Sequence, residues 1–483
     1  MNVAGSSATY NVSVGHESMH DADEAQFNVA VGAYSLTKEV DGHRNTAIGY
    51  QSLYSQTNAS STVTENVGVG IFAGWTNVTG TKNTWVGSNA GFGSASGSNS
   101  NNVGIGANVM LDVTTGNENV AIGSHAMYNA TTGYDTVAIG REAIGLGVYT
   151  GSDNTVVGKG AGYDLTSATN NTFVGRAAGA NLTVGSNNVA IGFQSFDAAN
   201  AGEAANIAIG YSAMGAVDET INSGAGVHSA DNNVAIGYNA LLGGVIGGGD
   251  VNDSTDRRLN HNIAIGYGSL DATGQNASLG QIAIGYDALG ANTSGYDNLA
   301  IGYESLDACT TGSQNVALGR GALGSTDDGV SNTAIGAYAM SIGNVGTSNT
   351  AVGSQAMTDS TGSYNTAVGM QSLFDCIGGG SNTVLGALAM KFANGGESDN
   401  VALGVQAMQD VKENGNTADS NIAIGTLAMK GGTLGGDFIG NIAIGRYAMD
   451  ATDTNSHTGT IAIGHNSLTA LTSGAGNTAI GYQ

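Results

Sequence analysis

The sequence predicts an all-β protein: a parallel β-solenoid of about 26 coils, each of about 17–19 residues. One short phrase recurs throughout, as "NTAIGYQSL" at Asn45, "NNVAIGYNALLGG" at Asn232 and "NLAIGYESL" at Asn298. Its central triplet alternates large and small apolar residues, the period of a strand. Proline is absent, so every backbone N–H is available to a hydrogen-bond ladder.

Each column of the repeat predicts a local structure. The repeat, aligned on the pattern Asn-x-x-x-Gly with Thr or Gln for Asn in three copies, occurs 26 times, from Gly15 to Gly481, and the residue before its glycine is always Ile, Val or Leu. Two places earlier the residue is always Val, Thr, Ile or Leu, and Ala lies between the two in 19 copies. β-Branched residues favour strands, so we place the Val and Ile columns in the core and the Ala column on the opposite face. Gly and Asn suit corners, because both tolerate positive φ.

A second apolar column lies four residues after the glycine. It holds Leu, Met, Ile or Phe in 21 of 25 copies and 10 of the 12 methionines. A stripe of methionines can form an adaptable binding groove, but at this regularity we interpret it as core filling. We expect each coil to contain two short strands and two turns, which cannot fold alone but bury a continuous core when stacked at about 4.8 Å.

The expected organisation is a lead-in at residues 1–10 followed by one repeat array at residues 11–483, with the last coil incomplete. Two spacings between repeats are long, which places loop insertions at residues 211–232 and 238–261. In solenoids such insertions gather on one face, often the binding face. The second holds a candidate contact loop for a glycan, cation or partner: Asp250, Asp253, Asp256, Arg257, Arg258 and His261. The alternative is a solvated loop with local ion pairs.

The alanine column is our candidate subunit interface, because small side chains allow another backbone to approach closely. Its members are Ala47, Ala121, Ala190, Ala235, Ala264, Ala300, Ala334, Ala402 and Ala443. The alternative is that alanine merely fills a thin coil. Tyrosines that follow the glycine, such as Tyr267, Tyr286 and Tyr303, suit either stacking on sugars or packing in ladders.

Charge and composition exclude several classes of function. The net charge of -25 opposes binding to nucleic acid or an anionic membrane, and divalent cations are expected only as weak counterions. No apolar run approaches the roughly 20 residues of a transmembrane helix, and the first residues lack the pattern of a signal peptide. Glycine-rich matches precede no long helix, the eight histidines show no zinc spacing, and no catalytic constellation stands out. We therefore expect no enzyme activity and no cofactor.

The two cysteines, Cys309 and Cys376, occupy the same repeat position, four coils apart. At the stacking rise this is roughly 19 Å, too far for a disulfide within one chain. We expect two thiols, or a link between chains if this column lies near a symmetry axis.

Several copies resemble the repeats of a known family. "NVAIGSHAM", "NIAIGYSAM" and "NTAVGSQAM" resemble repeats in the heads of trimeric autotransporter adhesins, and four copies share the variant "AG" (Ala73-Gly74, Ala90-Gly91, Ala161-Gly162, Ala178-Gly179). "NTAIGYQSL" is similar to repeats in tail fibres and surface proteins of phages, large viruses and some bacteria. The resemblance covers residues 11–483 and implies a left-handed β-roll that forms a homotrimer. The repeats are longer than those of adhesin heads, and neither a neck, a stalk, an anchor nor a chaperone domain is recognisable in this sequence.

The expected function is a structural or adhesive fibre, extracellular or on a virion, whose rigid trimeric shaft makes multivalent contacts. Its partners would be its own copies and a glycan or protein of a host surface. The alternative from another class is a monomeric ice-binding or other ligand-binding solenoid, which for ice requires an exposed threonine array. A polysaccharide-cleaving solenoid would need carboxylates clustered on successive coils, and none is evident in the sequence.

Overall fold

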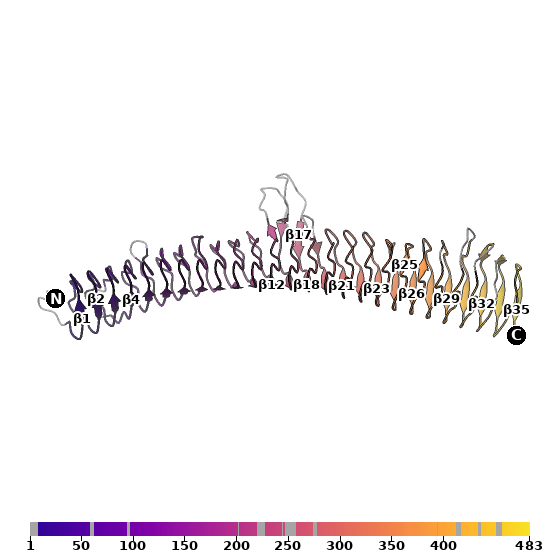
Figure 1. The fold of residues 1–483 in the computed structure, drawn as a ribbon, viewed down its shortest axis with the longest axis horizontal. Helices are drawn as coiled ribbons and strands as arrows, with labels where there is room; N and C mark the ends of the chain where they lie inside the picture. The colour runs from indigo at the N-terminus through magenta and orange to yellow at the C-terminus, as the bar shows by residue number, and fades with distance from the viewer. Residues whose placement is uncertain are drawn as a thin grey trace. The chain divides into compact units, whose positions relative to one another are not determined.

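A computed structural model describes residues 8–57, 62–93, 97–200, 202–219, 228–243, 245–246, 257–273, 278–393, 395–411, 417–432, 436–450 and 456–483. Within these ranges every regular element is a β-strand, and the strands pair in parallel from coil to coil (Figure 1). The prediction of an all-β parallel β-solenoid is therefore confirmed. The chain divides into unit 1, residues 1–257, and unit 2, residues 258–483.

The described residues of unit 1 form thirteen three-residue coil strands, each paired in parallel with the next. They are β1 (Val12–Val14), β2 (Val29–Val31), β3 (Thr46–Ile48), β4 (Val67–Val69), β5 (Thr84–Val86), β6 (Val103–Ile105), β7 (Val120–Ile122), β8 (Val137–Ile139), β9 (Thr155–Val157), β10 (Thr172–Val174), β11 (Val189–Ile191), β12 (Ile207–Ile209) and β15 (Val234–Ile236). Shorter strands lie in the predicted insertions: β13 (Asp218–Glu219), which pairs with β16 (Val245–Ile246), and β14 (His228–Ser229).

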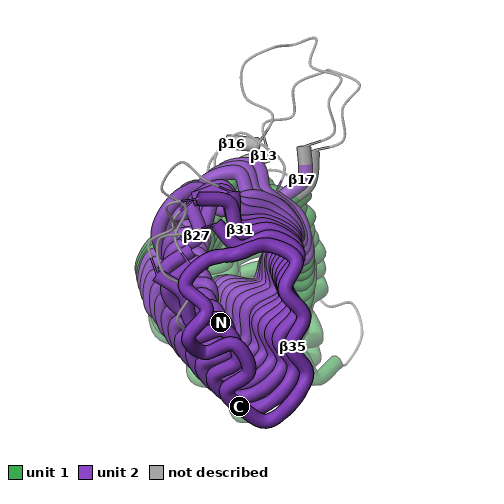
Figure 2. The backbone as a smooth tube through the Cα atoms, turned by 90° about the vertical axis from the view of Figure 1, so that its right-hand side faces the viewer, with its two compact units in different colours: residues 1–257 green, residues 258–483 purple. Residues whose placement is uncertain are grey.

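Unit 2 repeats this arrangement with thirteen coil strands, and Figure 2 shows its coils, in purple, stacked with closely matching outlines. They are β18 (Ile263–Ile265), β20 (Ile282–Ile284), β21 (Leu299–Ile301), β22 (Val316–Leu318), β23 (Thr333–Ile335), β24 (Thr350–Val352), β26 (Thr366–Val368), β28 (Thr383–Leu385), β29 (Val401–Leu403), β30 (Ile422–Ile424), β32 (Ile442–Ile444), β34 (Ile461–Ile463) and β35 (Thr478–Ile480).

A second strand per coil, which the sequence analysis expects throughout, occurs only in some of the described coils. In unit 2 the additional pairs are β17 (Arg257–Asn260) with β19 (Ser278–Leu279), β25 (Asp359–Ser360) with β27 (Asp375–Cys376), and β31 (Phe438–Ile439) with β33 (His457–Thr458). Elsewhere the return path of the coil consists mainly of turns and bends.

The coil interior has the opposite orientation to the one predicted. The central residue of the strand triplet is buried and its two β-branched neighbours face outward, as in β7, where Ala121 is fully buried and Val120 and Ile122 are partly exposed. The methionine and leucine column fills the interior, and Met127 and Met340 are fully buried. Core filling by this column is thus confirmed. These long side chains occupy the thin coil, so the inward strand position has room for little more than a methyl group.

Exceptions to the alanine column show how tight this space is. Trp85 and Phe173 occupy the inward position of β5 and β10 and are fully buried. A Cβ added at Gly91 would lie 2.3 Å from the Trp85 ring, and one at Gly179 would lie 2.6 Å from the Phe173 ring. The four "AG" copies therefore flank the two large aromatic residues, because a missing Leu or Met side chain makes room for each ring.

The glycine that ends each strand is required by conformation and by space, as predicted. Gly32 has a φ of +139°, and a Cβ there would lie 2.4 Å from the carbonyl oxygen of Gly49 in the next coil. The residues two and four places after these glycines also have positive φ. After Gly49 they are Gln51 and Leu53, which carry side chains. Most coils thus place two non-glycine residues in the left-handed region at this corner, a cost of roughly 1–2 kcal/mol per residue.

The asparagine column forms a buried ladder, which corrects the prediction that it supplies positive φ. The side-chain oxygen of Asn83 accepts from the backbone N–H of Asn102 at 3.0 Å and from its side-chain amide at 3.2 Å. The same amide donates to the carbonyl of Gly116 at 2.9 Å. Positive φ belongs instead to the residue before Asn, such as Asn101. Asn102 thereby links two coils and braces its own turn, and most asparagines of the column do the same; the side-chain nitrogen of Asn45 is an exception and has no hydrogen-bond partner.

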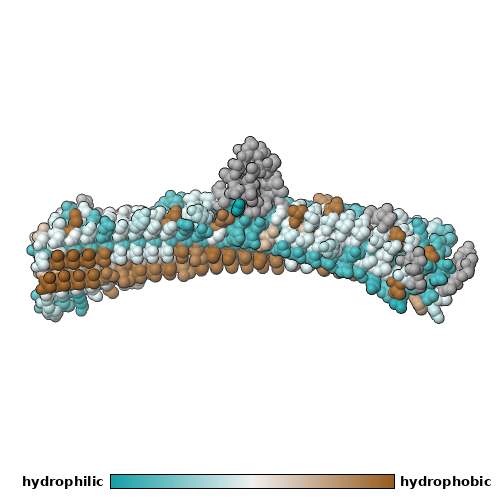
Figure 3. All heavy atoms as spheres, turned by 180° about the vertical axis from the view of Figure 1, so that it is seen from behind, coloured by the Kyte–Doolittle hydropathy of each residue, from teal (hydrophilic) through white to brown (hydrophobic). Residues whose placement is uncertain are grey.

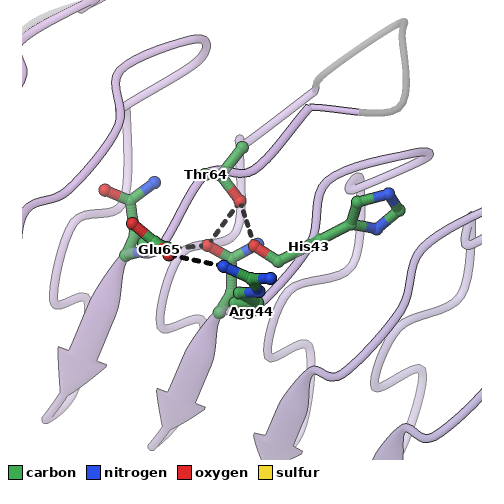
Figure 4. A network of polar contacts seen from close by, with 6 residues as sticks. His43, Arg44, Thr64 and Glu65 are labelled. Atoms are coloured by element: carbon green, nitrogen blue, oxygen red, sulfur yellow. Dashed lines mark hydrogen bonds and ion pairs between the residues drawn. The ribbon is translucent and has the colours of Figure 1, made fainter.

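Three of the 26 copies replace this asparagine, with Thr136, Gln281 and Thr460. At the first, the buried Tyr149 hydroxyl contacts the Thr136 hydroxyl at 2.6 Å and accepts from the Asn154 amide at 2.7 Å, which restores the link between coils. At the rung of Asn45, Thr64 adds a hydroxyl that donates to the His43 carbonyl and to Asn45, beside the exposed Arg44–Glu65 ion pair (Figure 4).

Candidate functional site

The largest candidate surface is the outer face of the coil strands. It consists of the two columns that flank the buried alanine, and the column next to the glycine holds only Val, Ile and Leu in all 26 copies. Ile139, Ile191 and Leu318 are 36%, 38% and 43% exposed, respectively. In unit 2 the column next to the glycine forms a continuous row of hydrophobic residues along one face, brown in Figure 3, and the other column is hydrophobic except where threonines interrupt it. Soluble monomers rarely expose a continuous apolar strip of this kind.

The alanine column, by contrast, cannot make contacts at this surface. All nine candidate interface alanines are fully buried within their own coils: Ala47, Ala121, Ala190, Ala235, Ala264, Ala300, Ala334, Ala402 and Ala443. The prediction that they face outward is wrong, because the large residues of the strand triplet, which we placed in the core, lie outside. A subunit interface on this sheet would be made by the flanking columns.

Most of the candidate contact loop lies outside the described residues. This holds for Asp250, Asp253 and Asp256, and only the backbone of Arg257 is described. Arg258 is half-buried and His261 is exposed. The loop therefore stays a prediction.

Tyrosines that follow the glycine pack as ladders. The rings of Tyr267, Tyr286 and Tyr303 stack with centroids 5.2 and 5.0 Å apart and interplanar angles of 8° and 9°. Stacked rings cover each other's faces and present their edges to solvent. Of the two interpretations left open, the ladder is confirmed, and stacking of a sugar on these faces would require the rings to separate.

An aromatic hollow of about 530 Å³ lies on unit 1 and is lined by Phe72, Trp75, Asn89, Phe92, Leu111 and Asp112. Trp75 and Phe92 stack at 4.9 Å, and Asn89 donates to Asn108 at 2.9 Å. The sequence analysis did not identify this cluster. Its signal is an aromatic residue at the fifth position after the glycine in three successive coils, namely Tyr54, Trp75 and Phe92.

A second hollow of about 440 Å³, which we call the Gly321 notch, lies on unit 2. Its lining residues come from four successive coils at the second, fifth and sixth positions after the glycine: Glu304, Asp307, Gly321, Gly324, Ser325, Tyr338, Ser341, Ile342, Gln355 and Thr358. One coil has glycine at both the second and the fifth position. Side chains of the coils on either side therefore border an open space one coil wide.

The remaining reactive groups are buried or dispersed. Cys309 and Cys376 are buried and form no disulfide, and burial raises the pKa of Cys309 to about 11, which keeps its thiol protonated. Burial of both thiols also argues against a link between chains. In the part of the chain that the structure describes, no three His, Cys, Asp or Glu side chains are placed to hold a metal ion. No helix among the same residues is long and apolar enough to cross a membrane.

Comparison with known proteins does not assign the chain to a family: no family model matches it, and neither does any curated protein. The repeat identity that the resemblance implies therefore stays a prediction, whereas the solenoid fold is established by the structure.

Proposed function

We propose that this protein is a non-enzymatic structural fibre whose chains associate through the outer face of the coil strands. The supporting observation is the unbroken column of Val, Ile and Leu beside each glycine, partly exposed along the strands of both units. Burying such a strip contributes roughly 25 cal/mol per Å² of apolar area, so association is strengthened by each additional coil that pairs.

The proposed assembly is a homotrimer, the stoichiometry that the resemblance to adhesin heads and tail fibres implies. A trimer places three apolar faces against one another and leaves the remaining corners of each coil in solvent. The proposed location is extracellular, on a cell surface or on a virion, where a stiff rod with several identical chains increases avidity for a host glycan or protein.

Light scattering on a sizing column tests association directly. We expect a mass near three chains for the native protein and a monomer for a variant with Ile139→Lys, Ile191→Lys and Ile236→Lys, which places three charges on the outer face. The matched control is Leu146→Lys, Val148→Lys and Val184→Lys, which adds the same charge at exposed positions of unit 1 that lie outside the coil strands. A native monomer, or loss of the trimer in both variants, would contradict the proposal.

A second candidate function, ice binding, is favoured by one observation. The threonine column, which the sequence analysis placed in the core, faces outward, and four successive strands of unit 2 present Thr333, Thr350, Thr366 and Thr383. An ice-recrystallisation assay on the native protein tests it. Activity in a monomeric sample would favour ice binding over the fibre, and its absence would remove this candidate.

A further inference from the structure

We propose that the Gly321 notch binds a neutral, polyhydroxylated ligand, a pyranose ring of a glycan. The notch exists because Gly321 and Gly324 lack side chains at two positions where the neighbouring coils carry Glu304, Tyr338, Asp307 and Ser341. Asp307 of the preceding coil and Tyr338 of the following coil border this space. A Cβ on Gly321 would lie 2.9 Å from the Tyr338 ring, and one on Gly324 would lie 3.3 Å from Oδ1 of Asp307.

One wall supplies hydrogen-bond acceptors. Asp307 and Glu304 lie on the same coil at its fifth and second positions, and both side chains are half-buried. Burial raises the pKa of Asp307, and the Glu304 carboxylate adds to the rise. A partly desolvated carboxylate gains most from donors that approach without water. Adjacent hydroxyl groups of a sugar supply two such donors.

The other wall supplies an apolar surface and further polar groups. Tyr338 and Ile342 are 40% and 53% exposed, and each offers apolar area to the C–H groups of a sugar ring. Ser341 and Gln355 lie on the same side at the fifth and second positions of their coils. A volume of about 440 Å³ falls within the roughly 300–1,000 Å³ of ordinary small-molecule sites.

At the aromatic wall, Arg320 disfavours a cationic ligand. The guanidinium of Arg320 lies 5.2 Å from the ring centroid of Tyr303 and 5.7 Å from that of Tyr338. The positive charge of Arg320 therefore repels an ammonium group at this aromatic wall, whereas a neutral sugar ring meets no such repulsion. Metal binding receives no support either, because the described residues hold no group of three potential metal ligands.

Glycan binding at this site is a separate property from self-association. It rests on the proposed function in one respect only: an oligomeric fibre would display several copies of the notch. A single chain contains all the residues of the notch. Failure of glycan binding and failure of trimer formation are therefore separate results, which the same samples distinguish when their native mass is also measured.

The test is saturation-transfer difference NMR of the full chain with methyl glycosides of glucose, galactose, mannose and N-acetylglucosamine. The key variant is Gly321→Gln, which fills the notch with the residue found at the same repeat position as Gln51, Gln194 and Gln355, all at positive φ. The matched control is Gly160→Gln, at the same repeat position in unit 1, where an added Cβ meets nothing within 4 Å.

We expect transfer to at least one glycoside with a millimolar Kd, a loss of about tenfold or more in Gly321→Gln, and no loss in Gly160→Gln. Asp307→Asn, which keeps the shape but removes the charge, should also weaken binding. The proposal is overturned by the absence of transfer to every glycoside, by equal transfer in Gly321→Gln, or by a site that responds to calcium or methylammonium instead.

Discussion

At the scale of single residues, the chain compensates where a rung of the asparagine ladder is missing. Thr136 cannot supply the amide, and the Tyr149 hydroxyl bridges it to Asn154. We expect Tyr149→Phe to lower the free energy of unfolding by about 1–3 kcal/mol, because it removes two buried hydrogen bonds, those to Thr136 and Asn154. Urea denaturation measures the loss.

Two further variants test this explanation. Adding Thr136→Asn to Tyr149→Phe should recover much of the loss, since it restores an ordinary rung. Tyr134→Phe, at a tyrosine that is 50% exposed, should leave stability unchanged. An equal loss for both tyrosines, or a double variant weaker than the single one, would show that the hydroxyl bridge contributes nothing.

The same tyrosine predicts a dependence on alkaline pH. Burial raises the pKa of Tyr149 from 10 to about 12, so the folded state favours the neutral phenol. Its contribution to stability is complete below pH 10, the unfolded value, and is lost as the pH rises through about 12. We expect urea midpoints to fall less between these values in Tyr149→Phe than in the native chain. A parallel decline in both would contradict the shift.

At the scale of the coil, glycine in place of Leu or Met makes room for a large aromatic residue at the inward strand position. Trp85→Ala should cost about 3–5 kcal/mol through the cavity that it leaves. Gly91→Met should also destabilise, because its Cβ would lie 2.3 Å from the indole ring. The double variant, Trp85→Ala with Gly91→Met, restores the common pattern of the repeat, with Ala in the strand and Met four residues after the glycine. We therefore expect the double variant to be more stable than either single variant, measured by thermal unfolding. Losses that simply add would exclude this compensation.

The same packing explains what the sequence could and could not predict. The period predicted the strand triplet, the corner glycine and the methionine core, since each depends on residues near one another in the chain. Alternation shows which residues share a face, but not which face is inside. Val120 and Ile122 face outward because the Met127 column already fills the coil. The Gly321 notch was not foreseen, because recognising it requires knowing that the second and fifth positions border the same hollow.

At the scale of the whole molecule, two properties oppose each other in association. The chain carries a net charge of -25, which repels other copies, whereas its outer strand face is apolar. Charge repulsion between copies is screened over about 30 Å at 0.01 M salt and about 8 Å at 0.15 M, while burial of apolar surface is little changed. The balance between the two terms should therefore depend on ionic strength.

We accordingly expect association to strengthen with salt. Sedimentation at increasing sodium chloride should show the proportion of oligomer rising at a fixed protein concentration, and the variant with three lysines on the outer face should stay monomeric throughout. Ion pairs between chains would produce the opposite trend, because salt weakens them. A proportion of oligomer that falls with salt would thus assign the interface to charged loops and would remove the outer strand face from the proposed function.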